Sequence, residues 1–250
     1  MPDLWASLLA TEGLALLGLA AFAAGLVRGF SGFGTALVFL PVAAQVLSPF
    51  GAILALIFMD LLAPLPNLRR AWASVERPDL LRLTLSGFLL LPVGLWVLTR
   101  VPPEVFRLIV CGLALLMLAA LMAGLRWRRP VAPRAVLGIG GLSGFLGGVA
   151  GLPGPPVILF YMARPLEPAR IRATILLYLF VFDLMLTGWM AGFGHLLPEF
   201  VLLGLLLGLP GMLGNWLGGR LFDPTREALY RGAAYGLIAL AALSGLPVWG

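Results

Sequence analysis

The chain has 250 residues, of which 61% are hydrophobic and only 11% are charged, and its mean hydropathy is +1.03. Soluble globular domains are about half apolar and about a quarter charged, so this composition excludes a soluble globular domain. The net charge of +6 comes from 17 basic residues, all of them arginine, which stand in short segments between apolar runs. Basic loops are the usual topology signal of membrane proteins, so the charge does not indicate a nucleic-acid-binding protein.

Ten apolar runs follow one another along the chain, and they predict an all-α polytopic membrane protein. A bilayer core of about 30 Å takes about 20 helical residues, and the second and seventh runs are too short to cross it alone. Each of these two runs directly follows a cluster of glycines, so we expect a broken helix or a re-entrant hairpin there. The runs lie at residues 12–29, 35–47, 50–66, 80–99, 105–125, 135–150, 155–163, 171–191, 198–218 and 228–246.

The two glycine clusters lie in Gly25–Pro41 (GLVRGFSGFGTALVFLP) and Gly144–Pro156 (GFLGGVAGLPGPP). In lipid every backbone N–H and C=O must be paired, so a broken segment at membrane depth must lie inside protein or line a cavity. Paired breaks at corresponding places in two halves of a chain point to a transporter binding site. We therefore expect the substrate to bind at these breaks.

The two halves of the chain resemble each other in the spacing of these glycines. Those at 25, 29 and 32 recur at 144, 148 and 151, a constant spacing of 119 residues. Similar spacings relate Asp60 to Asp183, and Gly94, Trp96 and Arg100 to Gly214, Trp216 and Arg220. Five elements per half is an odd number, so the second half would enter the membrane inverted. The predicted organisation is one membrane domain with a first repeat, an arginine-rich cytoplasmic connector and a second, inverted repeat, at residues 1–125, 126–134 and 135–250.

The arginines predict the orientation in the membrane. When the ten elements alternate, the groups near residues 69–82, 126–134, 164–172 and 220–231 all fall on one side, and only Arg100 and Arg107 fall on the other. Positively charged loops face the cytoplasm. We therefore expect a multi-pass protein of the inner (cytoplasmic) membrane with both termini outside.

The two breaks supply the candidate substrate site. Helix N-termini carry about half a positive charge and bind anions, so two half-helix starts that converge near the midplane would bind an anion. The alternative is that the glycines merely allow close helix packing. The candidate substrate-binding residues are Arg28, Gly29, Ser31, Gly32, Gly34 and Thr35 at the first break and Gly148, Gly151, Pro153, Gly154 and Pro155 at the second.

Three ionisable side chains within the apolar regions are candidates for a role in transport. The planar guanidinium of Arg28 suits the oxygens of sulfite, a sulfonate or a carboxylate. An ion pair, for instance with Asp60, and extension to the cytoplasmic surface are the alternatives. Asp60 and Asp183 are candidates for proton coupling, or for structural ion pairs and caps. The second break has no counterpart of Arg28, because the repeat places Gly147 there.

Polar side chains within the apolar regions could also contact a substrate, although each of them is more often a link between helices. They are Ser31, Thr35, Gln45, Ser143, Tyr161, Tyr178 and Asn215.

The sequence GLVRGFSGFG with Pro41, followed half a chain later by GGVAGLPGPP, resembles the TauE/SafE family of sulfite and organosulfonate exporters. The resemblance covers nearly the whole chain. It implies a membrane transporter of sulfite, a sulfonate or another small sulfur-containing anion, without enzyme activity, metal or cofactor. The expected partners are this anion and the lipid bilayer, and a homo-oligomer is left open.

The sequence leaves alternatives open for the direction of transport, for its coupling to protons and for the kind of protein. The inside-negative potential favours export of a monoanion by about 2.3 kcal/mol per 100 mV, whereas uptake of a similar anion would need coupling to protons. A divalent-cation carrier could use Asp60 and Asp183 as ligands. The sequence GFSG at residues 29–32 resembles that of rhomboid proteases, but we expect Ser31 and His195 to lie in opposite halves of the membrane.

Overall fold

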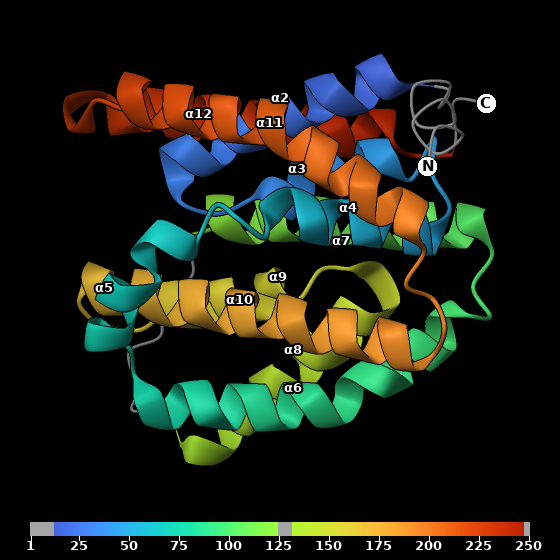
Figure 1. Ribbon diagram of the computed structural model, residues 1–250. Helices are drawn as coiled ribbons and strands as arrows, with labels where there is room; N and C mark the ends of the chain where they lie inside the picture. Colours follow the sequence, from blue (N-terminus) through green and yellow to red (C-terminus); the bar gives the residue numbers. More distant parts are fainter. Residues whose placement is uncertain (1–12, 125–131, 248–250) are drawn as a thin grey trace. The chain divides into compact units, whose positions relative to one another are not determined.

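The computed structural model describes residues 13–124 and 132–247, and these residues form helices joined by short connections (Figure 1). Eleven α-helices and two short 3-10 helices, η1 and η2, lie within the described ranges. Their bounds are α2 Leu14–Ser31, α3 Thr35–Ala43, α4 Pro49–Asp60, η1 Leu65–Asn67, α5 Leu68–Ser74, α6 Arg77–Leu98, α7 Pro103–Met122, α8 Pro133–Ala150, α9 Gly154–Met162, α10 Pro168–Gly192, α11 Pro198–Leu221, η2 Pro224–Arg226 and α12 Glu227–Ser244.

Each of the ten predicted apolar runs contains a helix, and the all-α prediction is confirmed for the described residues. Five helices, namely α2, α6, α7, α10 and α11, are long and apolar enough to cross a membrane. The pair formed by α4 and α5, with a bend of 50° between them, raises the number of candidate spans to six. The chain is therefore a multi-pass membrane protein.

The third predicted run, residues 50–66, is not one continuous element. Helix α4 ends at Asp60, and the bend leads through η1 into α5, so Arg69 and Arg70 lie in a helix and not in a loop. A proline inside a helix removes one backbone hydrogen bond, and its ring clashes with the carbonyl four residues earlier, so it bends or ends the helix. Pro64 stands four residues after Asp60, and the apolar residues around it conceal the bend in a hydropathy profile.

Both predicted breaks are present, between α2 and α3 and between α8 and α9. Gly32 and Gly151 have φ angles of 78° and 67°, in the left-handed region. Their N–H groups donate to Arg28 O at 2.7 Å and to Gly147 O at 3.0 Å, which ends each helix. A side chain in this conformation costs about 1–2 kcal/mol. The position of each break therefore follows from a local glycine signal.

The helices form two compact units, each assembled from segments that are distant in the sequence. Unit 1 is drawn from the ranges 1–62, 102–115 and 194–250, and unit 2 from the ranges 63–101 and 116–193. Within the described part of unit 1, α2 packs along α11, and α4 and α12 pack beside them. Within that of unit 2, α8 packs along α6, and α10 contacts α5, α6 and α9 (Figure 1).

Glycines bring the backbones of the main helix pair in each unit close together. A Cβ atom added to Gly25 of α2 would lie 2.1 Å from Gly211 O of α11. In unit 2, a Cβ on Gly144 of α8 would lie 2.3 Å from Gly87 O of α6. Neither distance allows a side chain, so both pairs depend on glycine, the usual means of close helix packing in membranes.

The contacts of the first, third and fourth helices of each predicted half correspond between the two units. The first helix of the first predicted half, α2, packs against the fourth helix of the second half, α11. Likewise, the first helix of the second half, α8, packs against the fourth helix of the first half, α6. The third helices, α4 and α10, contact these same partners, α11 and α6 respectively. The repeat and its inversion across the membrane both stay predictions. Residues 126–131 of the predicted connector and the chain ends at 1–12 and 248–250 lie outside the described residues.

Candidate functional site

Arg28 connects the three helices around the first break. It lies in the last turn of α2, and its guanidinium forms an ion pair with Asp60, the last residue of α4. Its Nη1 also lies 3.5 Å from Oγ1 of Thr35, the first residue of α3. The side chains of Arg28 and Asp60 are only 19% and 25% exposed. Of the three roles that the sequence leaves open for Arg28, the structure shows the ion pair.

Helix dipoles act differently on the two members of this pair. Both side chains lie at helix C-termini, where the partial charge is negative and favours a cation. Arg28 is therefore stabilised by α2, whereas Asp60 is destabilised by α4. A partly buried charge also needs a partner to offset its lost hydration. The Arg28 guanidinium thus supplies the main compensation for the charge on Asp60, and it would repel a metal cation from this carboxylate.

Ser31 is occupied by backbone groups of the first break. Its Oγ lies 2.8 Å from Val27 O and 2.7 Å from Phe33 O, so its hydroxyl is hydrogen-bonded to carbonyls of the turn. The His195 ring stacks on Phe50 at a centroid distance of 4.1 Å. Both residues of the protease alternative therefore have other partners.

The glycines of the first break fall into two classes. A Cβ on Gly29 would lie 2.6 Å from Asn215 O of α11, so helix packing accounts for Gly29. Gly32 and Gly34 have φ angles of +78° and +101°, and a Cβ on Gly32 would meet nothing within 4 Å. A Cβ on Gly34 would lie 2.9 Å from Val27 Cγ1, so the turn at Gly32 is the part of this break that leaves space for a ligand.

The second break is more enclosed. Residues 151–156 are all buried. Gly148 packs against α6, since a Cβ there would lie 2.5 Å from Leu91 O. Pro153 precedes α9, whose first turn holds Gly154 and Pro155, a place where proline is well tolerated. Whether these residues contact a substrate stays a prediction.

A buried chain of hydroxyl groups stabilises this second break. Ser143 Oγ of α8 donates to Pro153 O at 2.5 Å, and Tyr178 OH of α10 donates to Ser143 Oγ at 2.7 Å. Both side chains are fully buried. Burial raises the cost of an unpaired polar group, so Ser143 and Tyr178 link helices, one of the two roles expected for them from the sequence.

The two breaks differ where the first has Arg28. The repeat places Gly147 at this position, and a Cβ on Gly147 would lie 2.2 Å from Phe182 Cζ of α10. An aromatic ring therefore fills the space beside the second break. Only the first break presents a guanidinium from the last turn of its opening helix.

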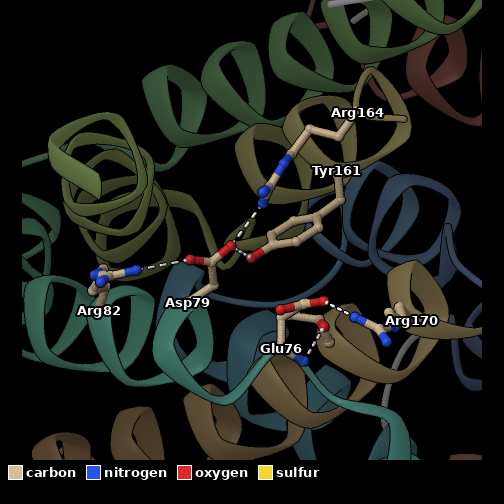
Figure 2. Close-up of polar contacts among 7 residues, drawn as sticks. Glu76, Asp79, Arg82, Tyr161, Arg164 and Arg170 are labelled. Atoms are coloured by element: carbon tan, nitrogen blue, oxygen red, sulfur yellow. Dashed lines mark hydrogen bonds and ion pairs between the residues drawn. The ribbon is translucent and has the colours of Figure 1, made fainter. Parts of the chain in front are cut away.

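A group of charged side chains surrounds Asp79, which lies in the first turn of α6 in unit 2 (Figure 2). Arg164 Nη1 and Arg82 Nη1 lie 2.6 Å and 3.1 Å from its carboxylate oxygens. Tyr161 OH of α9 donates to the same carboxylate at 3.0 Å. Asp79 is only 8% exposed. It therefore joins the C-terminal end of α9 to the beginning of α6.

A second ion pair lies beside this group. Arg170 of α10 contacts Glu76 at 2.7 Å, and the Glu76 backbone N–H donates to Thr174 Oγ1 at 3.2 Å (Figure 2). The orientation rule placed Arg82, Arg164 and Arg170 on one side of the membrane, and the structure gathers them in one part of unit 2. Sequence reasoning missed the two carboxylates, although both stand within an arginine-rich stretch, ERPDLLR at residues 76–82.

The two matched aspartates lie in different units. Asp60 pairs with Arg28 in unit 1. Asp183 lies within α10 of unit 2, and its backbone carbonyl accepts a bond from Thr187 Oγ1 at 2.7 Å. Across residues 13–124 and 132–247, no three or more His, Cys, Asp or Glu side chains are grouped so that they could hold a metal ion.

Comparison with known families matches residues 17–245 to a family model described as "Sulfite exporter TauE/SafE". The match contains both breaks, the Arg28–Asp60 pair and the Asp79 group. No curated protein and no solved structure matches the chain.

Proposed function

Because the chain belongs to the TauE/SafE sulfite exporter family, we propose that it exports a small sulfur-containing anion, such as sulfite or an organosulfonate, across the cytoplasmic membrane. The family is one of membrane transporters and not of enzymes, and five or six candidate spans agree with this. The observation that carries the proposal is Arg28, a partly buried cation beside an open turn in a broken helix.

Arg28 supplies the chemistry that an oxyanion requires. Its planar fork has five N–H donors and can hold two oxygens of a sulfite or sulfonate group at once. The first turn of α3 adds N–H groups that have no partner within the helix, and Thr35 adds a hydroxyl. We place the anion between the Arg28 guanidinium and the start of α3, beside Gly32 and Gly34.

The second break is the other proposed source of substrate contacts. The buried turn at Gly151 and Pro153 leads into α9, whose first residues Gly154 and Pro155 stand at a half-helix start like that of α3. Gly29 and Gly148 contribute by allowing the close packing that holds each break in place. That both half-helix starts bind the same anion near the membrane midplane stays a prediction.

The charge of the anion bears on the direction of its transport and on whether that transport must be coupled to protons. Export of a monoanion is driven outward by an inside-negative potential, about 2.3 kcal/mol per 100 mV, and needs no coupling ion. Proton-coupled uptake is the second candidate, because Asp60 is a carboxylate in contact with the proposed anion ligand. In liposomes, uniport responds to an imposed voltage alone. Coupled uptake responds to a pH gradient and is lost in Asp60→Asn or Asp183→Asn.

Arg28→Ala tests the proposed site. Removing a charge-assisted contact costs about 1.5–3 kcal/mol, so the dissociation constant for sulfite or a short sulfonate should rise at least tenfold. The control is Arg134→Ala, since Arg134 is exposed in the first turn of α8 in unit 2, at the opposite end of that helix from the second break. Binding is measured by calorimetry on purified protein, and flux is measured in liposomes with radiolabelled anion. Unchanged binding in Arg28→Ala would remove Arg28 from the site.

A further inference from the structure

The Asp60 carboxylate contacts the edge of the Arg28 guanidinium that a substrate anion would also need. The ion pair joins Asp60 Oδ1 to Nη1 of Arg28, the same nitrogen that lies 3.5 Å from Thr35 Oγ1. This nitrogen faces the start of α3, where the proposed function places the anion. Carboxylate and sulfonate groups use the same donors of a guanidinium, so the two anions cannot both bind this edge fully.

We propose that Asp60 is an internal competitor of the substrate, which must displace the Asp60 carboxylate from Arg28 in order to bind. Asp60 then sets how tightly the substrate binds and how fast it leaves. The inference rests on the proposed function, with Arg28 as the anion ligand, and adds to it a residue that determines affinity.

The surroundings of Asp60 make its displacement costly. Of the helices packed against α4, α3 carries no ionisable side chain, and α11 carries them only near its ends, at Glu199 and Arg220. Arg28 of α2 is the cation that is paired with this carboxylate. A displaced Asp60 would remain at the C-terminus of α4, where the helix dipole disfavours negative charge. This cost offsets part of the attraction between the substrate and Arg28.

A carrier benefits from such an offset. A partly buried guanidinium without a counter-ion would hold an anion strongly, and release would be slow. Conduction and transport require binding that is favourable enough for entry and weak enough for exit. Rebinding of Asp60 to Arg28 supplies a replacement partner at the moment when the substrate leaves.

Asp60→Asn tests the competition, because the amide has nearly the same shape and no charge. The dissociation constant for a short sulfonate should fall at least tenfold, and the maximal flux in liposomes should fall because release becomes slower. Asp60→Glu retains a competing carboxylate and should keep the affinity near that of the wild type. The matched control is Asp223→Asn in unit 1. The Asp223 carboxylate accepts hydrogen bonds from Thr225 in the connection before α12 and is not paired with Arg28. The dissociation constant of this variant should stay within twofold of the wild-type value.

A measurement on the wild type covers the case in which Asp60→Asn does not fold. Addition of the sulfonate should shift the antisymmetric carboxylate stretch in the infrared difference spectrum, because a displaced carboxylate loses its bonds to the guanidinium. The shift should persist in Asp223→Asn. Its absence in the wild type would overturn the inference.

The outcomes separate this inference from the proposed function. If the wild type binds the sulfonate and Asp60→Asn binds it equally or more weakly, Asp60 does not compete and only the inference fails. If binding survives in Arg28→Ala, Arg28 is not the ligand, and both the site and the inference fail. If no sulfur-containing anion binds to the wild type or to Asp60→Asn, the proposed function itself fails.

Discussion

A serine hydroxyl is hydrogen-bonded to a backbone carbonyl at each of the two breaks. Ser31 reaches Phe33 O, and Ser143 reaches Pro153 O, in both cases the carbonyl of a residue just before the second half-helix. Phe33 and Pro153 lie between the two half-helices of their breaks, and an unpaired backbone carbonyl is costly in a membrane. Because the serines engage these carbonyls, the N–H groups at the following half-helix start meet less competing negative charge.

Ser143→Ala should lower the stability of the protein. The change removes the donor to Pro153 O and leaves the Tyr178 hydroxyl without its acceptor in a buried place, at a cost of about 1–3 kcal/mol. The expected result is a lower thermal midpoint in detergent. Ser86→Ala is the control, because the Ser86 hydroxyl bonds Arg82 O within its own helix, α6. Equal midpoints for the two variants would contradict the role given to Ser143.

At the level of helices, glycine serves two different purposes in this protein. At Gly32 and Gly151 it allows a left-handed turn that ends a helix. At Gly29 and Gly148 it allows another helix backbone to approach. The same short motifs contain both kinds, which is why a glycine cluster alone does not identify the residues that contact a substrate.

Two glycine-to-alanine changes in unit 2 separate packing from helix propensity. Gly148→Ala would place a Cβ 2.5 Å from Leu91 O, a backbone atom that cannot move aside, and should destabilise the protein by about 1–3 kcal/mol or more. Gly188→Ala in α10 meets nothing within 4 Å and should be neutral, or stabilising by up to about 1 kcal/mol. Thermal unfolding in detergent measures both. Similar midpoints would show that the α6–α8 contact is looser than described.

At the level of the whole molecule, each compact unit combines helices from both predicted halves of the chain. Neither half would be compact alone, because α2 finds its main partner in α11 and α8 finds its main partner in α6. Folding therefore requires contacts between segments that are far apart in the sequence. The arginine groups predict the orientation, since positively charged loops are retained on the cytoplasmic side.

Labelling of single cysteines tests the predicted orientation. Ser74 and Thr99 are exposed, at the end of α5 and directly after α6. In a Cys111→Ala background, we expect Thr99→Cys to react with an impermeant maleimide on intact cells and Ser74→Cys to react only after permeabilisation. Cys111 is buried, so its replacement should leave both sites unaltered. The reverse pattern would place the termini in the cytoplasm.

The sequence by itself determined the features that depend on neighbouring residues. The apolar runs predicted the helices because crossing a bilayer requires a minimum length of apolar chain. The glycines at 32 and 151 predicted the breaks, because glycine adopts a left-handed turn without the steric cost that a side chain brings. The family also followed from short motifs, and the match over residues 17–245 confirmed it.

Only the tertiary structure decided which distant groups meet. Arg28 had three possible roles in the sequence, and the approach of α4 brought Asp60 to it. Tyr161 and Arg164 reach Asp79 across 82 and 85 residues of chain. The choice among such partners depends on how whole helices pack, because a side chain pairs with a charge that the fold brings within reach. The local sequence does not contain the distance between helices that are far apart along the chain.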